Sequence, residues 1–295
     1  MAEYPKVAGL WIGGALSWLE QLCLKSFVDM GHPTALYTYE EVTGVPEGVE
    51  ILSGQDILPD PDVYKHERSG SVALFSDIFR FNMIAKAPGT IWIDTDIYCW
   101  KPMVLPGSHY FGWESARQMN GAVLGLPADS EMLRLMLDFT SDPYNIPEFY
   151  NDAMIAEYRA RAEAGDPVHA GEMPWGVWGP HCVTWAAKKS GEVKHAQPTS
   201  VFYPVPFPDR NIFFRRPALS MRFAEENTLT YHLWGRIKRV SGRRHEGSVP
   251  DRSFLKYLLD KHEIDPTQAP ITSHGKFDFT AEGEAEDGAE DGAEA

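Results

Sequence analysis

The stretch Ile91-Trp92-Ile93-Asp94-Thr95-Asp96 joins three large apolar residues to two carboxylates. The apolar run follows the helix-breaking pair Pro88-Gly89 and predicts a short buried strand. Ligands of open α/β sheets bind at the carboxyl ends of strands, where Asp94 and Asp96 stand. Because side chains two residues apart in a strand point the same way, we expect both carboxylates to face one side. Such a pair suits a hard divalent cation, although an ordinary pair of surface aspartates in a turn would show the same pattern.

The flanking sequence predicts alternating strands and helices. On the N-terminal side we expect strands over 7–12, 34–39 and 49–52, and helices over 17–30 and 71–87. On the C-terminal side we expect strands over 110–113, 122–126, 200–204 and 228–234, and helices over 130–140, 151–164 and 180–189. Strand, helix and strand at the N-terminal spacing indicate parallel pairing. The pattern predicts an α/β fold with a mostly parallel central sheet flanked by helices.

The net charge of -15 is unevenly distributed along the 295 residues. Seven of the acids lie in 281–295, a segment of Ala, Gly, Glu and Asp that we expect to be a disordered tail after one domain over 1–280. The body still carries -8 without them, which argues against nucleic acid as a partner. We expect no signal peptide and no transmembrane segment. Three scattered cysteines (Cys23, Cys99 and Cys182) indicate reduced thiols and a cytoplasmic location.

A second polar segment, Ser76-Asp77-Ile78-Phe79-Arg80, lies in the helix expected over 71–87. Asp77 and Arg80 are three residues apart, so a carboxylate and a guanidinium share one face of the helix. A carboxylate can accept hydrogen bonds from a ribose or a base, and Arg can bind a phosphate with two parallel hydrogen bonds. A plain ion pair on a helix surface would have the same spacing.

Taken together, the Ser-Asp-x-x-Arg and Asp94-Thr95-Asp96 segments resemble a glycosyltransferase family with a DXD sugar-binding region. That family includes capsular and lipopolysaccharide sugar transferases and α-1,4-galactosyltransferases, and it is similar to the glucosylating domains of large clostridial toxins. Looser likeness is found in Gly9-Leu10-Trp11-Ile12-Gly13-Gly14, in Gly179-Pro180 and in Tyr231-His232-Leu233-Trp234. The resemblance spans about 5–240 and implies a GT-A type nucleotide-diphospho-sugar transferase fold.

The resemblance also implies a role for each matching position. The enzyme would be a metal-dependent, retaining transferase in which Asp94, Asp96 and Arg80 are catalytic. Mn²⁺ or Mg²⁺ would be held by Asp96, Asp94 and His232, although a lone histidine on an apolar strand often has a purely structural role. The donor, expected to be a UDP-sugar, would contact Trp11, Ser76, Asp77, Arg80, Asp94, Glu114, Asn120 and Lys238. The acceptor would be a glycan, a lipid-linked molecule or another acceptor.

Several alternatives stay open at this point. The basic stretch 236–244, with Arg210, Arg215 and Arg216 before it, is either a solvated surface, a loop that closes over the donor phosphates, or a patch that contacts an anionic acceptor or the membrane surface. The chain could also be a non-catalytic nucleotide-sugar-binding protein. A phosphotransferase of the haloacid-dehalogenase type would use Asp94 as its nucleophile, but in that class the DxD stands near the N-terminus.

Overall fold

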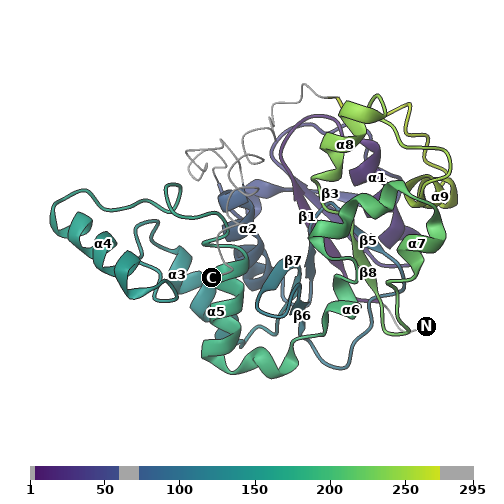
Figure 1. The fold of residues 1–295 in the computed structure, drawn as a ribbon. Helices are drawn as coiled ribbons and strands as arrows, with labels where there is room; N and C mark the ends of the chain where they lie inside the picture. Colours follow the sequence, from purple (N-terminus) through teal and green to yellow (C-terminus); the bar gives the residue numbers. More distant parts are fainter. Residues whose placement is uncertain (1–3, 60–72, 273–295) are drawn as a thin grey trace.

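A computed structural model of the chain describes residues 4–59 and 73–272 (Figure 1). Its centre is a six-stranded sheet with the order β3-β2-β1-β4-β7-β6. The strands are β1 (Val7–Trp11), β2 (Thr34–Thr38), β3 (Val49–Ser53), β4 (Ile91–Ile93), β6 (Tyr110–Trp113) and β7 (Met119–Gly125). β1 to β4 pair in parallel, and β7 and β6 add two antiparallel pairings. The predicted α/β fold with a mostly parallel central sheet is confirmed, and the expected tail at 281–295 lies outside the described residues.

Helices flank the sheet, and most of them lie in the second half of the described chain. They are α1 (Trp18–Asp29), α2 (Ala73–Lys86), α3 (Glu131–Thr140), α4 (Asp152–Glu163), α5 (Pro180–Ser190), α6 (Thr199–Phe202), α7 (Pro217–Met221), α8 (Ile237–Arg244) and α9 (Phe254–Lys261). Short 3₁₀ helices span Gly54–Asp56, Glu192–His195 and Phe207–Phe214. Figure 1 shows α4 projecting from the rest of the molecule, and Tyr158 is its only buried residue.

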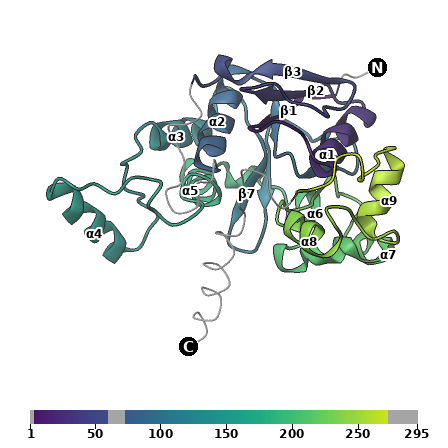
Figure 2. The ribbon, with the colours of Figure 1, turned by 90° about the horizontal axis from the view of Figure 1, so that it is seen from above.

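The two crossover helices α1 and α2 cover opposite faces of the sheet (Figure 2). On one face, Trp92 of β4 contacts Phe79 of α2, with 6.0 Å between the ring centroids. On the other face, Ile91 and Ile93 share a hydrophobic cluster with Phe27 of α1. Strand order reverses at β1, which has β2 on one side and β4 on the other. The carboxyl ends of β1 and β4 therefore flank a topological switch point, where α/β proteins form their ligand-binding crevice.

A second, two-stranded sheet was not expected from the sequence. β5 (Ile97–Cys99) pairs antiparallel with β8 (Thr230–His232), and Ile97 lies opposite His232. β8 is the central part of the strand predicted over 228–234. This pairing brings the turn after β4 next to the segment that follows β8.

Two segments have a structure other than the strand or the loop considered from the sequence. The segment predicted as a strand over 200–204 begins with helix α6, in which Val201 and Phe202 are both buried and the Tyr203 N–H donates to the Thr199 carbonyl (2.9 Å). A short apolar run without clear periodicity fits either structure. The basic stretch 236–244 is helix α8 rather than a loop, because Ile237 and Ser241, one turn apart, are buried against the protein.

The remaining structural expectations concern thiols and membrane spans. Cys23, Cys99 and Cys182 are all buried and free of disulfides. Among the described residues, no helix combines the length and the apolar character needed to cross a bilayer.

Candidate functional site

Trp11 and Asp94 stand at the carboxyl ends of the two strands that flank the switch point. Trp11 is the last residue of β1, and Asp94 follows the last residue of β4. The strands approach closely at Gly9, where a Cβ atom would lie 2.7 Å from the carbonyl oxygen of Ile93. A larger residue at position 9 would force the strands apart, so the spacing of the two site residues depends on this glycine.

Arg80 connects two of the predicted carboxylates. Its Nη2 atom lies 3.3 Å from Oδ1 of Asp77 and 3.3 Å from Oδ1 of Asp94. The Asp94 Oδ1 also accepts a hydrogen bond of 2.6 Å from the Trp92 indole N–H, and the guanidinium lies 5.2 Å from the centroid of the same ring. Gly121 leaves room for the arginine, since a Cβ there would be 2.6 Å from Nη1. Arg80 is thus a buried cation that binds protein carboxylates.

Asp77 is the more enclosed of the two carboxylates that contact Arg80. Burial raises its pKa from 3.8 to about 7, opposed by the charge of Arg80 and reinforced by that of Asp94. Gly179, the N-cap of α5, packs against the Asp77 carboxylate: a Cβ at this position would lie 3.0 Å from Oδ2. Ser76 contributes its hydroxyl, which accepts from Arg80 Nη2 at 3.4 Å. The Ser-Asp-x-x-Arg segment therefore acts as one unit on α2.

Asp96 is bound by the segment that follows β8. Its Oδ2 accepts a hydrogen bond of 2.6 Å from the Gly235 N–H and lies 3.2 Å from Nε2 of His232. Burial would raise the pKa of Asp96, but His232, the Gly235 N–H and the charge of Lys238 together lower it. Conversely, burial would lower the pKa of His232, whereas Asp96 raises it. An ionised Asp96 is thus favoured by its surroundings.

Trp234 has an unusual backbone conformation beside this pair. Its φ of 59° is in the left-handed region, which costs a residue other than glycine about 1–3 kcal/mol. The indole stacks on the His232 imidazole, with 3.7 Å between the ring centroids, and its N–H donates to the Val205 carbonyl at 3.2 Å. These contacts hold the turn that presents Gly235 to Asp96.

Asp94 and Asp96 have separate partners rather than a shared one. β4 ends at Ile93, and the Ile97 N–H closes a turn by donating to the Asp94 carbonyl at 3.0 Å. These two residues therefore lie in a turn, where side chains two residues apart need not point the same way. The expectation that both carboxylates face one side is wrong for this reason. Asp94 binds to the α2 side of the site and Asp96 to the β8 side.

The side chains around the carboxylate turn fit a divalent cation only in part. The described residues contain no group of three or more His, Cys, Asp or Glu side chains arranged to hold a metal ion. Asp96 nevertheless has a buried Oδ1 without a hydrogen-bond partner, as does the Nδ1 of His232. Mg²⁺ is commonly held by one or two carboxylates together with substrate phosphates and water. The orphaned Asp96 oxygen fits that kind of site, while the prediction that Asp94 and His232 are direct ligands stays a prediction.

The other predicted donor-binding residues lie in two places. Lys238 of α8 lies 5.1 Å from the centroid of the Trp11 ring and pairs with the buried Glu20. Asn120 of β7 donates to Glu114 at 2.5 Å. Burial raises the pKa of Glu114, while Asn120 and the charge of His232 lower it. Tyr203 connects Asn120 with the carboxylate turn, because its hydroxyl donates to the Asn120 carbonyl at 3.3 Å and its ring lies 5.8 Å from the His232 ring.

Sequence reasoning missed several residues of the site. Gly235 supplies the hydrogen bond to Asp96, Trp92 supplies one to Asp94, and the Tyr203 hydroxyl bonds to the β7 backbone by accepting from the Val123 N–H at 3.0 Å. Gly235 directly follows the strand expected over 228–234, and Trp92 lies inside the strand expected before Asp94; neither position gave a distinctive signal of these contacts.

No protein-family model matches the chain, and no curated protein matches it. Among the solved structures that resemble the chain are two glycosyltransferases of low identity. The PaToxG glycosyltransferase is 14% identical with a TM-score of 0.40, and the match covers 65% of this chain and 75% of that one. The ligand-free glycosyltransferase domain from the YGT toxin is 10% identical with a TM-score of 0.45, and the match covers 88% of this chain and 94% of that one. We therefore derive the function from the residues of the site.

Proposed function

We propose that the protein is a metal-dependent glycosyltransferase that takes a sugar from a nucleotide-sugar, with a UDP-sugar favoured. The observation that carries the proposal is the carboxylate turn at the switch point. Asp94 and Asp96 follow β4 there, beside Trp11 at the end of β1, and Asp96 keeps a buried oxygen without a partner. A crevice with carboxylates at this position of an α/β sheet is suited to a nucleotide diphosphate and its cation.

Each residue of the site has a binding or positioning task in this proposal. Trp11 stacks on the base, and Asp77 with Ser76 binds the nucleoside side of the donor. Arg80 orients Asp94, because its guanidinium lies 3.3 Å from that carboxylate. His232 and the Gly235 N–H fix Asp96 through its Oδ2, so that the other oxygen of the carboxylate is left for the cation.

The remaining charges favour the departure of the nucleoside diphosphate. When bound, Mn²⁺ or Mg²⁺ supplies Lewis-acid stabilisation to the leaving diphosphate. Lys238, which lies over Trp11, adds a second positive charge on the side where the base is expected. Glu114 and Asn120 then contact the sugar. Asp94 Oδ1 is bound by Arg80 and Trp92, which favours a positioning role over that of a phosphate-accepting nucleophile.

A thermal-shift titration tests the proposal. Mn²⁺ together with UDP-glucose should raise the melting temperature of the wild-type protein, since a ligand that binds only the native state stabilises it. Asp96→Ala should abolish this shift while the protein stays folded. Asp129→Ala, which removes an exposed carboxylate outside the site, should behave as the wild type does. An equal shift in Asp96→Ala and wild type would refute the assignment.

Turnover separates the enzyme from a binding protein on the same fold. We expect the wild type to release glucose from UDP-glucose in the presence of Mn²⁺, measured by enzymatic glucose assay. Donor binding without any release of sugar would instead identify a non-catalytic nucleotide-sugar-binding protein. Retention of the anomeric configuration is part of the proposal, and proton NMR of the first-formed product tests it. We also propose a cytoplasmic location, which the three buried free thiols support.

A further inference from the structure

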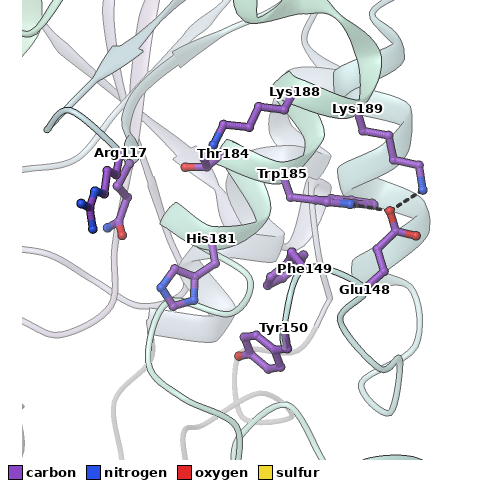
Figure 3. A pocket seen from close by; sticks show the side chains of 10 residues that line it. Arg117, Glu148, Phe149, Tyr150, His181, Thr184, Trp185, Lys188 and Lys189 are labelled. Atoms are coloured by element: carbon purple, nitrogen blue, oxygen red, sulfur yellow. Dashed lines mark hydrogen bonds and ion pairs between the residues drawn. The ribbon is translucent and has the colours of Figure 1, made fainter. Parts of the chain in front are cut away.

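A pocket outside the carboxylate turn has the composition of a ligand site. It has a volume of about 620 Å³ and lies between α5, the segment before α4 and the connection from β6 to β7 (Figure 3). Its lining residues are Arg117, Gln118, Glu148, Phe149, Tyr150, His181, Thr184, Trp185, Lys188 and Lys189. Ligand pockets of proteins range over roughly 300–1,000 Å³ and combine aromatic walls with a few polar groups. The volume lies in that range, and the lining combines the aromatic side chains of Phe149, Tyr150 and Trp185 with a larger share of polar and charged groups.

The aromatic wall is a packed cluster. Phe149 contacts Trp185 with 5.8 Å between the ring centroids and His181 with 6.4 Å. Tyr150 lies on the same His181 ring at 6.4 Å. Figure 3 shows Trp185 and His181 projecting from α5 towards the segment that carries Phe149 and Tyr150. Flat aromatic faces of this kind pack on the C–H face of a pyranose ring, which is apolar.

The charges of the pocket are unbalanced. Three cations face one carboxylate, and that carboxylate, Glu148, already pairs with Lys189 at 2.7 Å and accepts from the Trp185 indole N–H at 2.7 Å. In the described part of the chain, Arg117 and Lys188 have no carboxylate partner. A pocket with two such cations in an acidic protein is suited to an anionic ligand, because Arg and Lys form charge-assisted hydrogen bonds with carboxylates and phosphates.

Two buried polar atoms point to the same conclusion. The Tyr150 hydroxyl and the Nδ1 of His181 are buried without a hydrogen-bond partner among the described residues. Burial of an unsatisfied polar group is costly, so such groups in native proteins call for an explanation. Burial raises the pKa of Tyr150 and lowers that of His181, which leaves both neutral at neutral pH. A hydroxyl-rich ligand in this pocket, or the water it orders, would satisfy them.

Helix α5 links this pocket to the carboxylate turn. One side of the helix lines the pocket with Thr184 and Lys188, while its N-cap Gly179 packs on Asp77. The Thr184 hydroxyl also accepts a hydrogen bond of 2.9 Å from the Met119 N–H, next to Asn120. Helix α5 and the start of β7 therefore connect the pocket with Asn120, one of the residues proposed to contact the donor sugar.

We propose that this pocket binds the acceptor side of the reaction, a saccharide ring that carries a carboxylate or a phosphate. The aromatic cluster packs on the ring, and Arg117 with Lys188 binds its anionic group. The acceptor role rests on the proposed glycosyltransferase function, because only a transferase has an acceptor. The binding of an anionic saccharide can be measured without any donor.

Saturation-transfer NMR tests the binding with defined probes. We expect glucuronic acid or glucose 6-phosphate to receive saturation from the wild-type protein, and glucose to receive much less. The two anionic probes distinguish a carboxylate from a phosphate ligand. Arg117→Glu combined with Lys188→Glu should weaken binding of the preferred probe by about tenfold or more, because two charge-assisted contacts become repulsive. The control, Arg159→Glu combined with Lys194→Glu, reverses two exposed charges outside the pocket and should bind as the wild type does.

Several outcomes would overturn the inference. It fails if neither anionic probe binds, if glucose binds as well as both, or if the pocket variant binds the preferred probe as the control does at an equal melting temperature. It also fails if UDP displaces the probe, since the pocket would then belong to the donor site. If neither UDP nor UDP-glucose binds with Mn²⁺ in the thermal-shift titration, the proposed donor function is refuted instead, and the probe measurement stays intact.

Discussion

The raised pKa of Asp77 makes a quantitative prediction about stability. The pKa rises from 3.8 to about 7 because the carboxyl is buried, so between these values the folded protein holds a proton that the unfolded chain releases. The free energy of unfolding must then fall as the pH rises through this interval. One unit of pKa corresponds to about 1.4 kcal/mol, and integration from about pH 5 to about pH 7 gives a loss of about 2 kcal/mol from this group alone.

Asp77→Asn isolates this contribution, since an amide of the same shape does not titrate. Loss of the ion pair with Arg80 shifts the variant's stability, but the pH dependence of the difference between the two proteins belongs to the carboxyl. We expect the variant to gain about 2 kcal/mol on the wild type between about pH 5 and about pH 7. Urea denaturation at a series of pH values measures it, with the free energy extrapolated to zero denaturant.

An exposed carboxyl provides the control for this measurement. Asp129→Asn alters an exposed carboxyl in the turn before α3, and its profile should run parallel to that of the wild type. If the Asp77→Asn profile also runs parallel to the wild type, the carboxyl titrates alike in the folded and unfolded chains. The buried cluster with Arg80 would then not exist in solution as described.

Three further predictions concern the same site and the tail. Arg80→Ala should destabilise the protein by about 3–5 kcal/mol, measured by denaturation, because it leaves two carboxylates near each other without their cation. His232→Ala should weaken Mn²⁺ binding about tenfold to a hundredfold in calorimetry; an unchanged affinity with a lowered melting temperature would reduce His232 to a packing role. Deletion of 281–295 should leave the melting temperature and donor binding almost unchanged, and a fall of several degrees would contradict a tail without packing contacts.

Local patterns of the sequence were enough to predict part of the site. The i, i+3 spacing of Asp77 and Arg80 predicted a shared helix face, and the structure has their ion pair on α2. Hydrophobic periodicity predicted the first strand, the first helix and the second strand, and the Gly31 turn marked the boundary between the helix and the second strand. These features depend on neighbours in the sequence, which is why sequence reasoning reached them.

The rest depends on contacts between distant segments. A strand was predicted around β8, but β5 has only three residues, too few for a periodic signal, so their pairing across the fold was not predicted. The partners of Asp96 were therefore predicted only in part, with His232 named and Gly235 missed. The pocket beside α5 combines three segments that are far apart in the chain, so no local sequence motif predicts it.

The long sequence separation between Asp96 and its partners affects the order in which the protein folds during synthesis. His232 and Gly235 follow Asp96 by 136 and 139 residues. At the usual rate of synthesis a ribosome needs roughly ten to thirty seconds to add that much chain, so the Asp77–Arg80–Asp94 cluster can assemble well before Asp96 has its partners. Such distant pairings also close late in refolding, because a large loop must first be ordered. After dilution from denaturant, helical circular dichroism should therefore recover before nucleotide binding does.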